Sequence, residues 1–395
     1  PPLLLPPPPG PYNVGCVDLQ IPHPAPLKSK FSAPAHLSLR LLYPTDAPAG
    51  SLAYQPLGGK ICDRFMAFGA PAPLKPAGFL LHYWRLITLP FAENAAPAAG
   101  LGSMPVTVYS HGLGGSPSLY SSPAGNLASS GSLVVLVEHL DGSTPLSQLA
   151  DGSLLEHYSP IYELRKDGDR EWDTPAYVGE RREQIEVRIK EMEAALGFVR
   201  RLQKGGVREL PEGVTFKGRL DLKEGAHLVG HSYGGATILG TAGRAKEGVV
   251  RSVAAHDPAV DWVPDDVRYN LLKESGETEG WRLRGCGGYK DERKLERGGE
   301  SKGLDGVPLL FIYCDDWQKT DFGHWFATLK KIEEGSVGAE GSRGMVLDSM
   351  QHFEFSDNCC IMPLWLAKGL KFSGGKPEQK IREVFVETLA FQKRC

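Results

Sequence analysis

A serine framed by glycines lies between a predicted strand and a predicted helix. The segment Gly230–Gly235 reads GHSYGG; it follows the apolar run Ala226–Val229 and precedes the small and apolar residues Ala236–Leu239. A strand, a sharp turn and a helix in this order form the nucleophile elbow that exposes a reactive serine. The glycines are needed because the strained turn leaves no room for a Cβ beside the strand and the helix. The sequence therefore predicts that Ser232 is a catalytic nucleophile.

The same Gly-x-Ser-x-Gly spacing occurs a second time, at Gly299–Gly303. That match lies in a charged stretch, with no apolar strand before it and no apolar helix after it. Context therefore favours Ser232 over Ser301. The alternative interpretation of Ser232 is a small residue in a glycine-rich turn.

A serine hydroxyl is a weak nucleophile at neutral pH, so it needs a general base. In folds with a nucleophile elbow the triad follows the chain order Ser, then Asp or Glu, then His. Three histidines come after Ser232, namely His256, His324 and His352. His256 precedes any later strand end that could supply an acid, and His324 begins a helical run. We predict His352 as the base, because it follows the last predicted strand, where a loop can reach back to Ser232.

The acid that orients this histidine has two possible positions. Asp257 ends the predicted strand 250–255, whereas Asp315 and Asp316 follow the predicted strand 307–313. Either strand is expected near the strand that carries the elbow. Spacing alone leaves both positions open.

The tetrahedral intermediate of acyl transfer needs hydrogen-bond donors for its oxyanion. In this type of fold they are the N–H after the nucleophile and an N–H in the loop after an earlier strand. These positions correspond to Tyr233 and to Leu113 in the glycine-rich loop Ser110–Gly115. The alternative is a phosphate-binding loop, but the sequence of this loop has neither the G-x-x-x-x-G-K-[ST] nor the G-x-G-x-x-G spacing.

The seven cysteines show neither C-x-x-C nor zinc-ligand spacing, so we expect no cofactor and no bound metal.

Strand patterns alternate with helical patterns along the chain, which predicts an α/β fold with a mostly parallel sheet and helices on both faces. The predicted strands are 37–43, 106–109, 133–137, 226–229, 250–255, 307–313 and 344–347. Between them, apolar residues recur on one face of residues 178–203, which predicts a long amphipathic helix packed on the sheet.

The composition favours one large domain. The chain has 395 residues, of which 41% are hydrophobic, and a net charge of −3. This charge gives no general attraction to nucleic acid. We expect a flexible proline-rich tail at 1–10, followed by a single domain at 11–395 with insertions around 141–176 and 264–303.

Seven segments, in the same order, resemble the platelet-activating-factor acetylhydrolases of the monomeric α/β-hydrolase type. They are Gly10–Cys16, Leu39–Pro44, Tyr109–Gly114, Val137–His139, Gly230–Thr237, Pro308–Ile312 and His352–Asp357. They are spread over most of the chain, from residue 10 to residue 357. Leu140 departs from the family, which has a basic residue there, and the segment 264–303 is longer than its counterpart.

The resemblance implies an α/β-hydrolase fold and a calcium-independent serine esterase. Such enzymes remove the sn-2 acetyl group, or short or oxidised acyl groups, from platelet-activating factor and related phospholipids. Matched position by position, it implies Ser232 as nucleophile, Asp257 as acid and His352 as base, with Leu113 and Tyr233 as oxyanion donors. Two alternatives are a general carboxylesterase or lipase on the same fold, and a catalytically silent lipid-binding protein.

The resemblance also implies contact with a lipid surface. The candidate segments are Phe79–Ile87 and Met362–Leu366, in which Trp and Tyr suit a bilayer interface. Packing of the same residues inside the protein is the alternative. We expect a phospholipid substrate, no nucleic-acid partner, a monomer, and an intracellular protein that is soluble or peripherally bound to membrane.

Overall fold

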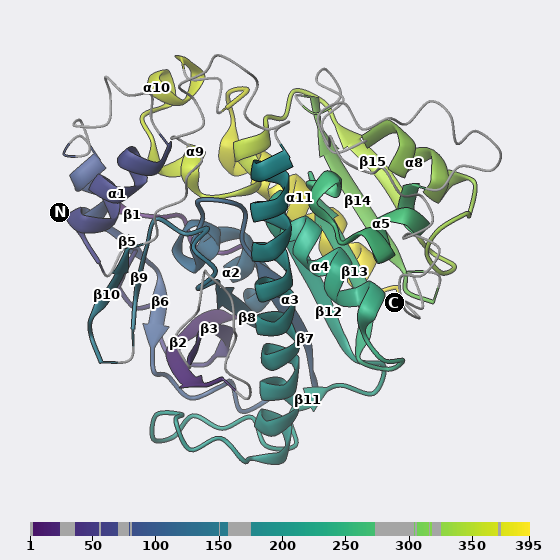
Figure 1. Cartoon of the computed structure of the whole chain (residues 1–395). Helices are drawn as coiled ribbons and strands as arrows, with labels where there is room; N and C mark the ends of the chain where they lie inside the picture. The colour runs from purple at the N-terminus through teal and green to yellow at the C-terminus, as the bar shows by residue number, and fades with distance from the viewer. Residues whose placement is uncertain are drawn as a thin grey trace.

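A mostly parallel β-sheet forms the centre of the fold (Figure 1). In order across the sheet the strands are β15 (Arg343–Leu347), β14 (Leu309–Cys314), β13 (Val250–His256), β12 (Ala226–His231), β7 (Met104–Ser110), β8 (Leu133–Glu138), β3 (His36–Thr45), β2 (Asn13–Pro22) and β6 (Phe91–Glu93). A short strand, β11 (Leu220–Asp221), also pairs with β7. Along this path only β3 runs against its neighbours. The computed structural model describes residues 3–23, 36–54, 57–69, 79, 81–149, 151–156, 175–272, 304, 306–315, 317, 325–369 and 373–395.

All seven predicted strands are present, because each predicted run is rich in apolar residues that a sheet covered on both faces can bury. Sequence analysis missed β2, the long strand that pairs antiparallel with β3 along its whole length. Its sequence, NVGCVDLQIP, alternates weakly and lies next to prolines, so its period was hidden.

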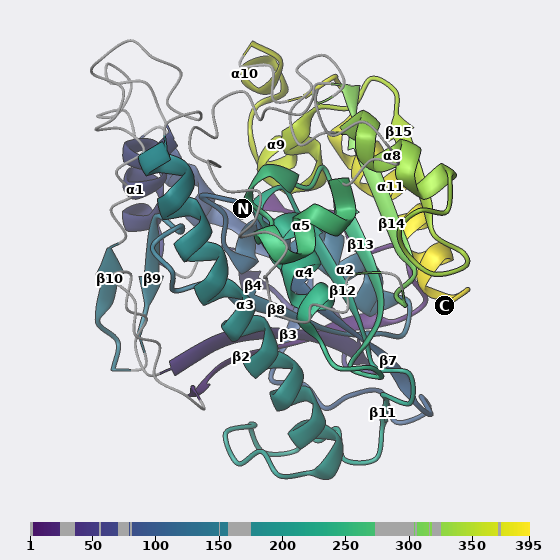
Figure 2. The same cartoon turned by 45° about the vertical axis from the view of Figure 1, so that its right-hand side comes forward.

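Helices cover both faces of the sheet (Figure 2). On one face α3 (Pro175–Lys204) and α4 (Tyr233–Arg244) pack together, and on the other α2 (Ser121–Ser129) packs against α11 (Pro377–Gln392). The apolar face predicted for α3 is buried, at Ile185, Ile189, Met192, Phe198, Val199 and Leu202. The fold class is therefore the predicted one.

The proline-rich segment at the N-terminus differs from the expected flexible tail. Residues Leu3–Leu4 form β1, which pairs in parallel with β5 (Ile87–Leu89), and Leu5 is buried. Further along, the Gly10 N–H donates to the Ser129 hydroxyl at 3.1 Å. The described part of this segment is extended, as its proline-rich composition predicts. It also packs on the protein, because burial of apolar side chains such as Leu5 stabilises the contact.

The two proposed insertions contain ordered elements. In the first, β9 (Leu146–Gln148) and β10 (Leu154–Glu156) form an antiparallel pair. In the second, α5 (Asp265–Leu272) packs on α4 and buries Val267 and Leu271. Residues 273–303 lie outside the described part of the chain. The prediction of a single domain stays a prediction, supported among the described residues by one ten-stranded central sheet and one main hydrophobic core.

The carboxyl ends of β12, β13 and β14 meet at one edge of the sheet, because these strands are parallel. Near that edge lie the 3-10 helix η8 (His352–Phe355) and the short helices α9 (Asn358–Ile361) and α10 (Leu364–Gly369). Ligands of α/β sheets bind at this edge.

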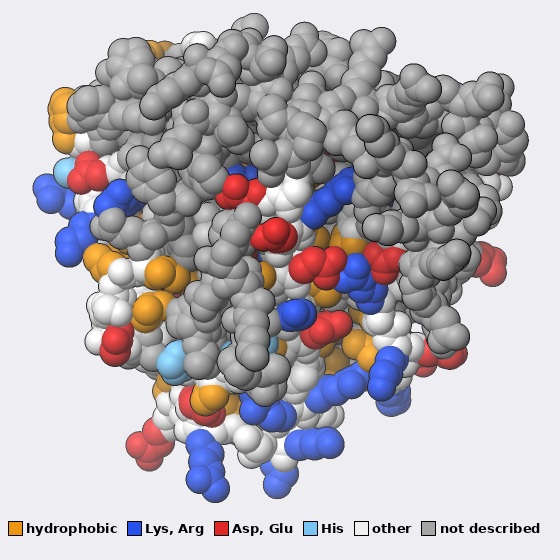
Figure 3. All heavy atoms as spheres, in the orientation of Figure 1, with side chains coloured by type: hydrophobic (Ala, Val, Ile, Leu, Met, Phe, Trp, Pro, Cys, Tyr) orange, Lys and Arg blue, Asp and Glu red, His pale blue; other side chains and the backbone are white. Residues whose placement is uncertain are grey.

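On the face shown in Figure 3, basic and acidic side chains are interspersed among the described residues, with no uniform basic surface.

Candidate active site

Ser232 occupies the turn between β12 and α4. Its backbone has φ 57° and ψ −118°, a conformation that residues with a Cβ rarely adopt. A Cβ on Gly230 would lie 2.4 Å from the Gly234 carbonyl oxygen, and one on Gly234 would lie 2.1 Å from the Ser110 carbonyl oxygen. Glycine is thus required at both positions for the strand and the helix to approach so closely. The Ser232 N–H donates to the carbonyl of His256 at 2.9 Å, which ties the turn to the adjacent strand.

The three predicted triad residues lie in one hydrogen-bonded chain. His352 Nε2 is 3.0 Å from the Ser232 Oγ, and His352 Nδ1 is 3.0 Å from an Asp257 carboxylate oxygen. In the protonation state needed for catalysis, Nδ1–H donates to the carboxylate and Nε2 accepts from the hydroxyl. This arrangement can deprotonate the serine during its attack on a carbonyl carbon.

Asp257 is buried at the end of β13, where its backbone φ is 40°. The Cys314 N–H donates to Asp257 Oδ1 at 2.8 Å, and the Cys314 thiol donates to Asp257 Oδ2 at 2.6 Å. Burial raises the pKa of the Asp257 carboxyl, and the hydrogen bonds from His352 and Cys314 oppose that rise. The carboxylate is therefore held by fixed donors instead of water.

His352 begins η8, and 20% of its side chain is exposed. Its ring stacks on Trp317, with centroids 4.8 Å apart and an interplanar angle of 19°. On another side lies the ring of His231, 4.5 Å away. Glu354 closes the turn, because its carboxylate accepts the Gln351 N–H at 2.8 Å. These contacts fix the ring plane that both hydrogen bonds of the chain require.

The predicted oxyanion donors lie on the loop after β7 and at the start of α4. In the loop, the N–H groups of Gly112, Gly114 and Gly115 already donate, to the Tyr120 hydroxyl at 3.0 Å, the Ser143 carbonyl at 2.8 Å and the Gly112 carbonyl at 3.1 Å. The Leu113 N–H makes no hydrogen bond to the part of the chain that the structure describes. Leu113 therefore stays the predicted oxyanion donor of this loop. Tyr233 begins α4, and N–H groups in the first helical turn point out of the helix end.

Asp315, one of the two alternative positions for the acid, makes a different contact. Asp315 lies at the end of β14, where its carboxylate accepts the Ser349 N–H at 2.7 Å and so fixes the loop before His352. Asp316, His324 and Ser301 lie outside the described residues.

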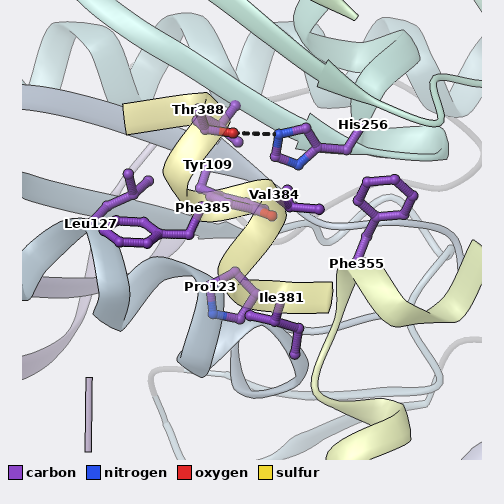
Figure 4. Close-up of a pocket in the computed structure, with 10 residues that line it drawn as sticks. Tyr109, Pro123, Leu127, His256, Phe355, Ile381, Val384, Phe385 and Thr388 are labelled. Carbon is purple, nitrogen blue, oxygen red and sulfur yellow. Dashed lines mark hydrogen bonds between the residues drawn. The ribbon is translucent and has the colours of Figure 1, made fainter. Parts of the chain in front are cut away.

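His256 is a core residue on the far side of the sheet from Ser232. Its Nε2 is 3.0 Å from the Thr388 hydroxyl on α11, and it lines a cavity of about 10 Å³ with apolar neighbours (Figure 4). Such a volume holds at most one water molecule. Burial lowers the pKa of His256 to about 3, so it stays neutral.

Sequence analysis missed a polar stripe on α3, formed by Arg181, Gln184, Arg188 and Glu191, all of which are buried. Arg188 pairs with Asp141 at 2.9 Å and donates to the His111 carbonyl at 2.7 Å, two residues before Leu113 in the predicted oxyanion loop. Its guanidinium also lies 4.5 Å from the centre of the Tyr233 ring. The four polar residues of the stripe recur every three or four positions, which places them on one face of the helix. This spacing could have been read from the sequence, but only the fold shows what the side chains contact.

One group of described side chains has the atoms to bind a metal, namely Asp257, Cys314 and His352, whose ligand atoms lie within 4.8 Å of one another. Two of these residues belong to the hydrogen-bonded chain of Ser232. His352 is hydrogen-bonded to Asp257, and Asp257 also accepts from the Cys314 thiol.

The sheet order and the strained serine turn together define an α/β-hydrolase fold. A ferulic acid esterase from Streptomyces cinnamoneus has a similar fold, with a TM-score of 0.58 and 17% sequence identity, over 99% of this chain and 92% of that chain. Residues 2–260 match the family model described as platelet-activating factor acetylhydrolase, isoform II, and the chain belongs to this family. That match includes Ser232 and Asp257, and His352 lies beyond it.

Curated relatives point to the same family. Platelet-activating factor acetylhydrolases from Canis lupus familiaris and Bos taurus are 31% and 30% identical to this chain, over 58% and 59% of its length. Each match covers 50% of the relative, so the chain spans about half the length of these proteins.

Proposed function

We propose that the protein is a serine esterase that hydrolyses the sn-2 acetyl ester, or a short or oxidised acyl ester, of platelet-activating factor and related glycerophospholipids. The observation that carries the proposal is the hydrogen-bonded chain from Ser232 through His352 to Asp257, with both contacts at 3.0 Å. Family membership supports the choice of ester.

In the proposed mechanism the Ser232 Oγ attacks the ester carbonyl carbon while His352 Nε2 takes its proton. Asp257 accepts a hydrogen bond from Nδ1–H and stabilises the imidazolium that forms. The Leu113 and Tyr233 N–H groups bind the developing oxyanion. His352 then gives its proton to the departing glycerol oxygen. Water repeats these steps on the acyl-enzyme and releases the short acid and free Ser232.

The Asp257 environment suits this role. Because the dielectric around the buried carboxylate is low, its attraction to the imidazolium is stronger than it would be in water. The two Cys314 donors hold it in place, so little reorganisation is needed when the charge on His352 appears.

We further propose that part of the surface near the site contacts lipid. Phe79, Leu86 and Trp365 have 64%, 55% and 75% of their surface exposed, which is unusual for side chains so large and apolar. The segments Phe79–Ile87 and Met362–Leu366 lie close together, because the Tyr83 hydroxyl donates at 2.5 Å to the carbonyl of Ile361, the residue before Met362. Trp84 and Ile87 are buried, so the proposed lipid-contact surface does not include them. Among described residues, none of the helices has the length and apolar character needed to cross a bilayer.

The proposal is tested by comparing esters on purified protein. Platelet-activating factor, a matched phosphatidylcholine with long sn-2 chain, and p-nitrophenyl acetate separate acyl length from headgroup. A steep fall of kcat/KM from the acetyl to the long-chain phospholipid supports the proposal. Equal rates on all three esters would instead indicate a general carboxylesterase, and failure of a fluorophosphonate probe to label the protein would indicate a catalytically silent binding protein.

A further inference from the structure

Three kinds of metal-binding atom meet behind the histidine of the active site. The Cys314 Sγ is 2.6 Å from Asp257 Oδ2, and His352 Nδ1 is 3.0 Å from the same oxygen. All three atoms lie within 4.8 Å of one another. They come from the ends of β13 and β14 and from η8, so no sequence spacing brings them together.

We propose that Cys314, Asp257 and His352 form an inhibitory site for a thiophilic divalent cation, with Zn²⁺ as its representative. Thiolate sulfur, imidazole nitrogen and carboxylate oxygen are the ligands that proteins use for zinc. A thiolate disfavours Mg²⁺ and Ca²⁺, which prefer oxygen. Binding replaces the Cys314 S–H proton with the ion, and the His352 proton moves from Nδ1 to Nε2 so that the imidazole binds as a neutral ligand. One proton is therefore released to solvent for each ion bound. Water supplies the fourth ligand.

The required movement is small. Zinc lies about 2.3 Å from sulfur and about 2.0–2.2 Å from nitrogen or oxygen, so neighbouring ligand atoms are roughly 3.3–3.6 Å apart. Cys314 Sγ and His352 Nδ1 therefore each have to move about 1 Å or less away from the shared Asp257 oxygen. They are already within 4.8 Å of each other. Asp257 and Cys314 are fully buried, whereas 20% of the His352 side chain is exposed. We expect the ion to enter on the His352 side, with the imidazole ring as the ligand that moves.

Metal binding at this position opposes the proposed chemistry. With the ion on Nδ1 the ring proton is on Nε2, so Nε2 has no lone pair left to take the proton of Ser232. The ion also occupies the carboxylate that would stabilise the imidazolium. The inhibition rests on the proposed esterase function, but the binding of the ion does not.

The test compares the wild-type chain with Cys314→Ser, which keeps a hydrogen-bond donor for Asp257 but removes the soft ligand. The double variant Cys359→Ser/Cys360→Ser is the control for the other neighbouring thiols. After chelator treatment, each protein is titrated with Zn²⁺ while p-nitrophenyl acetate hydrolysis is followed and normalised to its own metal-free rate. In parallel, Co²⁺ is added and the near-ultraviolet thiolate-to-cobalt absorption band is recorded.

We expect Zn²⁺ to inhibit the wild type and the control alike, and the half-inhibitory concentration to rise at least about tenfold in Cys314→Ser. The cobalt band should be present in the wild type and the control and absent in Cys314→Ser. If Cys314→Ser does not fold, His352→Ala replaces it in the cobalt titration, where a weaker or shifted band is expected.

Equal zinc inhibition of the wild type and Cys314→Ser would overturn the proposal. A cobalt band that is lost in the Cys359 and Cys360 variant would do the same, because the ion would then be bound elsewhere. If the protein has no esterase activity, the cobalt spectrum still decides whether the ion binds. Failure of the esterase proposal is therefore distinguishable from failure of this one.

Discussion

Arg188 on α3 donates from Nη1 to the carbonyl oxygen of His111 at 2.7 Å, which fixes the predicted oxyanion loop two residues before Leu113. Its Nε pairs with Asp141 at 2.9 Å, and both side chains are fully buried. Although burial alone raises the pKa of the Asp141 carboxyl, the Arg188 charge and the Ser143 hydrogen bonds outweigh it, and the pKa is lowered. Because the guanidinium also lies over the Tyr233 ring, one residue touches both sides of the predicted oxyanion hole.

Arg188→Lys tests this positioning role. Arg188 donates to the Asp141 carboxylate, the His111 carbonyl and the Ser143 hydroxyl. A lysine keeps the charge but cannot donate to all three, because it lacks the planar fork of donors. We expect kcat to fall by roughly 10- to 100-fold with little change in KM, as the loop loses its alignment with the oxyanion. Arg200→Lys, an exposed change on the same helix, is the control. A rise in KM with unchanged kcat would show that Arg188 acts on binding instead.

The acid and base assignments are tested by Asp257→Asn and His352→Ala. Each should lower kcat by roughly 10⁴, because triad members act as a unit. Asp315→Asn should have a far smaller effect, since its carboxylate bonds the Ser349 N–H and not His352. Steady-state kinetics on p-nitrophenyl acetate measure all three. Should Asp315→Asn be the inactive variant, the acid lies one strand later than we infer.

The lipid-contact surface is tested by Leu86→Gln combined with Trp365→Gln. Both side chains are more than half exposed, so the double change should leave the melting temperature nearly unaltered while reducing sedimentation with liposomes. Hydrolysis of a soluble ester should also be unaltered. Val386→Gln on α11, where 56% of the side chain is exposed, is the matched control. Parallel loss of stability and of soluble-ester hydrolysis would mean that these residues support the core.

Asp357 predicts a pH dependence of stability. It is buried and accepts the Ser122 N–H at 3.1 and 3.2 Å, and burial raises its pKa from 3.8 to about 7. Between these two values the folded chain binds a proton that the unfolded chain has released, so this contribution to stability declines as pH rises toward 7.

Asp357→Asn should therefore lose less stability than the wild type between pH 5 and pH 8, because the amide stays neutral. Urea unfolding at a series of pH values measures the difference. The exposed Asp348→Asn variant should follow the wild type. Identical pH slopes for the wild type and Asp357→Asn would contradict a buried proton at this position.

Local sequence rules identified the Ser232 turn because glycine positions and apolar runs encode it directly. The order of the triad narrowed the base to His352, but spacing left Asp257 and Asp315 open, since both follow strands that end at the same edge. Arg188 and Cys314 could not be predicted, because their roles depend on contacts between segments far apart in the chain. Composition also misjudged the N-terminal segment, where burial of Leu5 outweighs the tendency of a proline-rich chain to stay free.

Covalent labelling tests the central claim most directly. The purified chain is treated with a fluorophosphonate, digested, and the modified residue identified by mass spectrometry. We predict one adduct, on Ser232, and none in a folded Ser232→Ala variant, whereas Ser301→Ala should label like the wild type. An adduct on another serine, or full labelling of Ser232→Ala, would contradict the assignment of Ser232 as the nucleophile.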